Sequence, residues 1–140
     1  MFAELFIALY AGHAVGDHWV QTSHQAGVKG EIGWRGRRAC AAHVATYTAT
    51  QVFFLAAAGI VLHLHVSSSQ FWAGLAVSAV THYFADRRAP LRRLARLLGS
   101  EQFYDLGRNP QRPCLGTGAY ALDQSWHIGW LFVAALIMSY

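Results

Sequence analysis

The feature that most constrains this chain is a set of four apolar segments separated by polar connections. The segments cover about residues 1–20, 39–62, 70–86 and 119–140. An α-helix rises about 1.5 Å per residue, so about twenty residues cross the roughly 30 Å hydrocarbon core of a bilayer. Only 13% of the residues are charged, whereas a soluble domain carries about a quarter. The pattern predicts an all-α fold, a four-helix transmembrane bundle that forms one membrane domain over residues 1–140.

The distribution of basic residues predicts how such a bundle is oriented. All 11 Lys and Arg residues lie in two connections, residues 21–38 and 87–118. Because basic loops stay in the cytoplasm, we expect these connections inside and both termini outside, in a multi-pass protein of the cell inner membrane. In a soluble protein, the same basic blocks would suggest nucleic-acid binding. The apolar segments between them argue against a nucleic-acid partner.

A further short helix is predicted between the third and fourth segments. Residues 87–99 read RRAPLRRLARLLG, which places Leu91, Leu94 and Leu98 on one helical face and arginines, including Arg88, around the rest. This pattern is typical of an interfacial helix that lies on anionic lipid headgroups. Residues 99–118 are rich in Gly, Pro, Asn and Ser, and we expect a loop there.

Each apolar segment carries two polar side chains four positions apart, which places them on one face of a helix. Random placement predicts about one His–acid pair at this spacing, whereas the sequence has three. All four pairs lie near the predicted cytoplasmic ends, and ionisable groups within a membrane normally face the bundle interior. We therefore expect one shared site. The pairs are His13 with Asp17, His43 with Tyr47, His82 with Asp86, and Asp123 with His127.

Imidazole and carboxylate groups together favour a divalent metal ion, with zinc preferred and manganese or iron as alternatives. Four histidines and three aspartates exceed the needs of one tetrahedral zinc. Either two ions bind, or some residues orient ligands or move protons. In a catalytic site, Asp17, Asp86 or Asp123 would act as general base, and Tyr47 would donate a hydrogen bond to an oxyanion. The predicted ligands are His13, Asp17, His43, His82, Asp86, Asp123 and His127.

Two other interpretations of these groups remain open. Polar side chains also hold membrane helices together, each contributing about 0.6 to 2 kcal/mol. The same groups can also move protons or ions without a fixed metal. On either interpretation the chain is a non-enzymatic membrane protein, handling metal or protons, or a phage factor that binds a host membrane partner. Haem between two histidines fits less well, because three carboxylates suit hard metal ions better.

The ordered set of polar residues resembles a known family. It reads His13-x-x-x-Asp17-x-x-x-Gln21, Lys29, His43-x-x-x-Tyr47, His82-x-x-x-Asp86 and Asp123-Gln124-x-x-His127. This resembles the family catalogued as domain of unknown function 3307, small membrane proteins of phages and bacteria. The chain departs from the family at His18, where an aromatic residue is common, and at Arg87-Arg88, where lysine is commoner. The family is distantly similar to membrane-bound metal-dependent hydrolases, which implies hydrolysis.

Together these patterns predict an integral-membrane metal-dependent hydrolase that acts at the cytoplasmic membrane face. Its substrate would be a lipid or another anionic molecule close to the membrane, and an oligomer is compatible with the sequence. The residues expected to support the ligands or to contact the substrate are Gln21, Lys29, Gln124 and Arg88.

Overall fold

The computed structural model describes residues 1–108 and 116–140. These residues form helices and no strand, which confirms the all-α prediction for this part of the chain. The long helices are α1 (Phe2–Val15), α3 (Trp34–Leu62), α4 (Ser68–Asp86) and α7 (Gly118–Ser139), and a π-helix, η1 (Gly16–Val20), continues α1. The short helices are α2 (Ser23–Val28), α5 (Ala89–Leu97) and α6 (Glu101–Tyr104).

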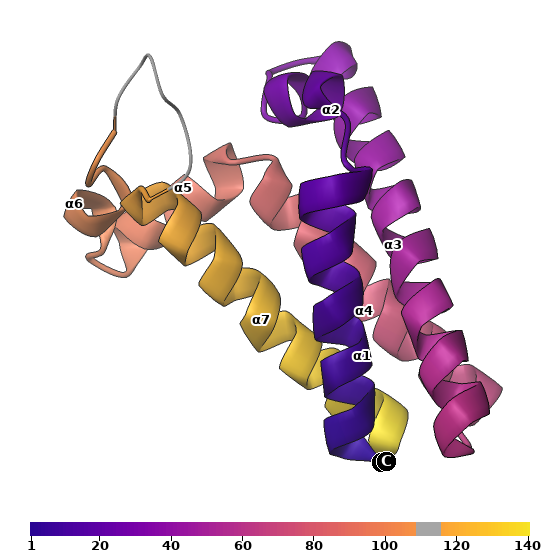
Figure 1. The fold of residues 1–140 in the computed structure, drawn as a ribbon. Coiled ribbons are helices and arrows are strands. Elements are labelled where there is room, and N and C mark those ends of the chain that lie inside the picture. Colours follow the sequence, from indigo (N-terminus) through magenta and orange to yellow (C-terminus); the bar gives the residue numbers. More distant parts are fainter. Residues whose placement is uncertain (109–115) are drawn as a thin grey trace.

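The four long helices form the body of the molecule (Figure 1). Helix α1 packs against α3 and α7, and α4 packs against α7 and, less extensively, α3. The two termini lie together at one end of this body, whereas α2, α5 and α6 lie toward the other end (Figure 1). The described basic residues of both connections therefore gather at the end opposite the termini.

The observed boundaries differ from the predicted ones in three places. The first segment is not one regular α-helix, because α1 ends at Val15 and a π-helical turn follows. The first basic connection contains α2, which begins with a reciprocal cap: the Thr22 hydroxyl accepts from the Gln25 amide, and the Gln25 side chain accepts from the Thr22 amide. A loop was predicted over residues 99–118; the prediction is wrong for Glu101–Tyr104, which form α6, and residues 109–115 lie outside the described residues. The helix predicted after residue 87 is present as α5.

Two glycines bring α1 into close contact with α3. A Cβ atom at Gly12 would lie 3.0 Å from the Gln51 Cα, and one at Gly16 would lie 3.0 Å from the Tyr47 ring. Small residues let helix backbones approach closely, which shortens the distance that polar side chains must span. The glycines thus set the spacing between the α1–η1 segment and α3 beside the polar cluster.

The buried side chains of the bundle differ in polarity between its two ends. An apolar core lies at the end that carries the termini and consists of Leu5, Ala8, Leu9, Leu55, Leu75, Leu131, Ala134, Ala135 and Met138. Toward the other end, the buried side chains include a polar set: His13, His43, Gln51, Ser78, His82, Asp86 and His127. The outward faces instead carry large apolar side chains. Examples from all four long helices, 46% to 76% exposed, are Ile7, Phe53, Ile60, Trp72, Val80 and Phe132.

Of the helices in the described residues, α3 alone has the length and composition to cross a membrane. Helix α1 ends too early to qualify as one continuous helix. Helices α4 and α7 carry polar site residues, including His82 and His127, which lower their apolar character. The helical part of the predicted fold is therefore observed, and four membrane crossings remain a prediction.

We expect Gly12→Ala to lower the free energy of unfolding by about 1–3 kcal/mol, because the added methyl group meets the α3 backbone. The matched control is Gly59→Ala. A Cβ at Gly59 meets no atom within 4 Å, and alanine there favours the helix by about 0.5–1 kcal/mol. Thermal unfolding of both variants in detergent measures the difference. Equal midpoints would contradict the close approach.

Candidate metal centre

The structure brings the seven predicted ligands together from five helical elements. His13 lies on α1 and Asp17 on η1, His43 on α3, His82 and Asp86 on α4, and Asp123 and His127 on α7. The four imidazoles and Asp86 are buried, whereas the Asp123 side chain is 26% exposed. Three overlapping groups of these residues have ligand atoms within 4.8 Å of one another. These His and Asp groups can hold a metal ion.

The tightest part of the cluster, here called site 1, consists of Asp17, His43, His82 and Asp86. The Nε2 atoms of His43 and His82 lie 3.0 Å apart. Asp17 Oδ1 lies 3.3 and 3.4 Å from these nitrogens, and Asp86 Oδ2 lies 3.3 and 3.2 Å from them. Tetrahedral zinc, with bonds of about 2.0 Å, separates its ligand atoms by about 3.3 Å. His43, His82 and Asp86 therefore have the spacing of ligands to one ion, and Asp17 Oδ1 lies at similar distances from the same two nitrogens.

The electrostatics of the cluster also favour a cation. Asp17 Oδ1 and Asp86 Oδ2 are buried, and within the described residues neither accepts a hydrogen bond. Buried carboxylates without partners are costly. Three carboxylates face one ammonium, that of Lys29, whose Nζ lies 2.6 Å from Asp86 Oδ1. With neutral imidazoles the cluster retains two uncompensated negative charges, which one divalent ion balances.

Lys29 reaches the cluster because the end of α4 holds the α2 connection in place. Arg87 donates to the carbonyl oxygens of Lys29 and Glu31. Arg88 donates to the Ala26 carbonyl at 3.0 Å, so its guanidinium is directed at α2 and away from the ligands. Sequence analysis missed this role of Arg87, and the predicted substrate contact through Arg88 has no support in this geometry.

The two glutamines predicted to support the site lie in different positions. Gln124 Oε1 lies 3.2 Å from His13 Nε2, and its amide nitrogen donates to Asp123 Oδ2 at 3.3 Å. Gln124 thus connects two predicted ligands. Gln21 follows η1, and its side-chain nitrogen Nε2 is buried without a hydrogen-bond partner in the described residues. Its geometry connects it to no ligand.

A buried polar triad extends the cluster into the bundle. The Tyr47 ring stacks on His82 with centroids 3.8 Å apart. Gln51 Nε2 donates to the Tyr47 hydroxyl, and the Ser78 hydroxyl donates to Gln51 Oε1, both at 2.9 Å. The Tyr47 hydroxyl accepts from Gln51, and Ser78 Oγ at 3.4 Å is an acceptor for its hydrogen. The predicted donation to an oxyanion would compete with this contact to Ser78. Gln51 lies four residues after Tyr47 and Ser78 four before His82, so the same spacing could have identified both.

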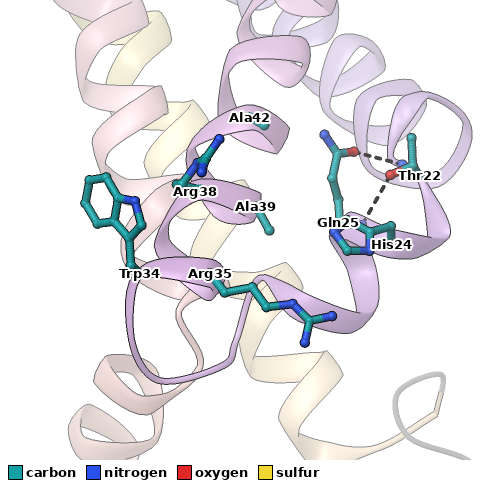
Figure 2. Close-up of a pocket in the computed structure, with 8 residues that line it drawn as sticks. All are labelled: Thr22, His24, Gln25, Trp34, Arg35, Arg38, Ala39 and Ala42. Carbon is teal, nitrogen blue, oxygen red and sulfur yellow. Dashed lines mark hydrogen bonds between the residues drawn. The ribbon is translucent and has the colours of Figure 1, made fainter.

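A surface pocket of about 550 Å³ lies apart from the cluster, between α2 and the start of α3 (Figure 2). Its described lining contains none of the predicted ligands. It includes Trp34, Arg35 and Arg38, and Arg35 also lies 3.8 Å from Glu31. The pocket thus places positively charged side chains beside the connection between α2 and α3.

Comparisons of the chain with family models, with curated proteins and with solved structures return no match. The chemistry of the site is accordingly derived from the side chains themselves. The prediction that His and Asp groups can hold a metal ion is confirmed by their mutual distances, and zinc as the identity of that ion stays a prediction.

We expect Gln51→Leu to lower the free energy of unfolding by about 1–3 kcal/mol, because it leaves the buried Tyr47 and Ser78 hydroxyls without their shared partner. Thr50→Val is the control: Thr50 is adjacent, and its hydroxyl bonds only the Thr46 carbonyl of its own helix. Thermal unfolding in detergent compares the two. A smaller loss in Gln51→Leu than in Thr50→Val would contradict a stabilising triad.

Proposed function

We propose that this protein is an integral-membrane metalloenzyme, a metal-dependent hydrolase acting at the cytoplasmic membrane face. The observation that carries the proposal is site 1, where two imidazole nitrogens lie 3.0 Å apart and each lies 3.2 to 3.4 Å from one oxygen of Asp17 and one oxygen of Asp86. Zinc is the proposed ion, because N and O ligands at this spacing match its tetrahedral preference.

The membrane part of the proposal is supported by the placement of apolar and polar side chains. Large apolar side chains, such as Phe53 and Ile60, are exposed on the outside, while polar groups are buried inside. A soluble protein has the reverse distribution, with apolar side chains inside and polar ones outside. Large exposed apolar surfaces mark contact with a partner or a membrane. We infer that α1–η1, α3, α4 and α7 cross the bilayer, with the basic end in the cytoplasm.

The resemblance to the domain of unknown function 3307 family is part of this proposal. Its support is the ordered spacing of the polar motifs, from His13-x-x-x-Asp17 to Asp123-Gln124-x-x-His127. The residues that carry this spacing are those that gather in the cluster, apart from Gln21. A phage or bacterial origin and a hydrolytic reaction follow from the same resemblance.

A bound zinc would activate a water molecule and polarise the substrate. In site 1, Asp17 and Asp86 would hold the ion through oxygens that accept no hydrogen bond within the described residues. Asp123 is the most exposed of the three carboxylates and faces the same cluster. It is therefore the proposed general base, because a proton acceptor must be reachable by water and substrate.

Basic and apolar side chains at the same end support a lipid or another anionic substrate close to the membrane. Leu97 and Leu98 are exposed at the end of α5. Two α5 arginines are already paired, since Arg92 contacts Asp105 and Arg96 contacts Glu101. The Arg96 hydrogen bond lowers the pKa of Glu101, so this pair stays charged. The pocket residue Arg38 forms no ion pair within the described residues and is therefore better placed than Arg92 and Arg96 to attract an anionic headgroup.

The alternative is a non-enzymatic membrane protein that handles metal or protons. Such a role needs a polar path through the membrane. The polar triad extends the path only as far as Gln51 and Ser78, and the apolar core of the other end follows. A reaction at one membrane face fits this arrangement better than passage through it.

We expect alkaline phosphatase fused after Tyr140 to be active and the same enzyme fused after Leu98 to be inactive, because it folds only outside the cytoplasm. Green fluorescent protein at the same positions gives the reciprocal control, since it fluoresces inside. Activity in the opposite pattern would contradict the orientation, and equal activity at both positions would contradict the membrane topology.

We expect elemental analysis of detergent-purified protein to find at least one zinc per chain, and His43→Ala to lose the ion of site 1. His65→Ala is the control, because His65 is exposed in the link between α3 and α4. In vesicles of anionic phospholipid, the parent should release a product detectable by ³¹P NMR, and Asp86→Asn should slow release by about 100-fold or more. Absence of metal would contradict the site, and metal without turnover would favour the non-enzymatic alternative.

A further inference from the structure

We infer that the cluster holds a second divalent ion, called site 2, between the His13–Asp17 pair and the Asp123–His127 pair. Asp17 would bridge the two ions. This inference rests on the proposed function, because it takes the ion of site 1 as its first member. It goes further by assigning the ligands that site 1 leaves unused.

The two oxygens of Asp17 face different imidazoles. Oδ1 lies 3.3 Å from His43 Nε2 and 3.4 Å from His82 Nε2, within site 1. Oδ2 instead lies 3.6 Å from His13 Nδ1. One carboxylate thus presents one oxygen to each side. This is the arrangement of a bridging ligand, and two-metal sites hold their ions about 3.5–4 Å apart.

The hydrogen bonds of Gln124 determine which nitrogen of His13 is available. Gln124 donates its amide hydrogen to Asp123 Oδ2, which directs its Oε1 toward His13 Nε2 at 3.2 Å. An amide oxygen accepts only, so His13 carries its hydrogen on Nε2. The lone pair of Nδ1 therefore faces Asp17 Oδ2, another acceptor. Within the described residues, His13 Nδ1 has no hydrogen-bond partner. A cation between these two atoms satisfies both.

The opposite side of site 2 comes from α7. His127 Nε2 is buried without a hydrogen-bond partner in the described residues and lies 3.5 Å from Asp123 Oδ2. The His127 and His13 ring centroids are 5.1 Å apart. Gln124 contacts both pairs and fixes a ligating histidine through its other nitrogen, as outer partners of metal ligands do. The two pairs thus offer two nitrogens and two carboxylate oxygens; Asp123 would contribute Oδ2, which leaves its other oxygen for the role of proton acceptor.

The ligand atoms of each pair of site 2 also lie close to a residue of site 1. His13, Asp17 and His82 have ligand atoms within 4.8 Å of one another, as do Asp86, Asp123 and His127. Each group joins residues of site 2 to a residue of site 1. The seven candidate ligands therefore form one continuous cluster, which contains more ligands than one four-coordinate ion needs.

Elemental analysis tests the inference through stoichiometry. We expect two ions per chain in the parent, one in the double variant Asp123→Asn, His127→Gln, and two in the control His65→Ala. If the double variant does not fold, His127→Gln alone is measured beside the parent. One ion in the parent and one in the variant would overturn site 2 and leave site 1 intact. No ion in either protein would overturn the proposed function itself.

The bridge is tested by electron paramagnetic resonance of protein loaded with Mn²⁺. We expect a spin-coupled spectrum in the parent, because ions that share Asp17 lie close together. The double variant should show the signal of an isolated ion. An uncoupled spectrum in a parent that binds two ions would overturn the bridge.

Discussion

The structure depends on the meeting of two buried carboxylates with two imidazoles from η1, α3 and α4. Charged groups are costly to bury unless they are paired, and of the three carboxylates only Asp86 contacts a lysine within the described residues. The surrounding architecture brings an oxygen of Asp17 and an oxygen of Asp86 within 3.2 to 3.4 Å of both imidazole nitrogens. Gly12 and Gly16 bring α1–η1 onto α3, and Arg87 holds the α2 connection that supplies Lys29. The cluster thus explains features that apolar packing alone would not require.

The π-helical turn η1 occupies the position where α1 would otherwise continue regularly. Its hydrogen bond runs from the Gln21 amide to the Gly16 carbonyl, five residues back. Such turns are uncommon and occur often at functional sites. Asp17 lies within η1, and it is the residue whose two oxygens face two sets of imidazoles. The π-helical turn therefore contains Asp17, the carboxylate that lies near three of the four imidazoles.

Much of this arrangement was predictable because a helix converts a spacing of four into a shared face. His82 and Asp86, or Asp123 and His127, are identified by that rule, and the same rule extends to Gln51 and Ser78. The π-turn, the direction of Arg88 and the engagement of the Tyr47 hydroxyl were not predictable. They depend on how separate helices pack, and no local spacing in the sequence encodes that.

The division of the bundle into an apolar and a polar half bears on what the cluster can do. The apolar core around Leu9 and Met138 closes one end, so the polar groups are reached from the basic end. Lys29 comes from that end as well, on a connection outside the four long helices. This basic connection is thus part of the site. A displacement of α2 would remove the Lys29 ammonium from Asp86 and raise the negative charge of the cluster. The affinity of the cluster for a cation is therefore coupled to the position of α2.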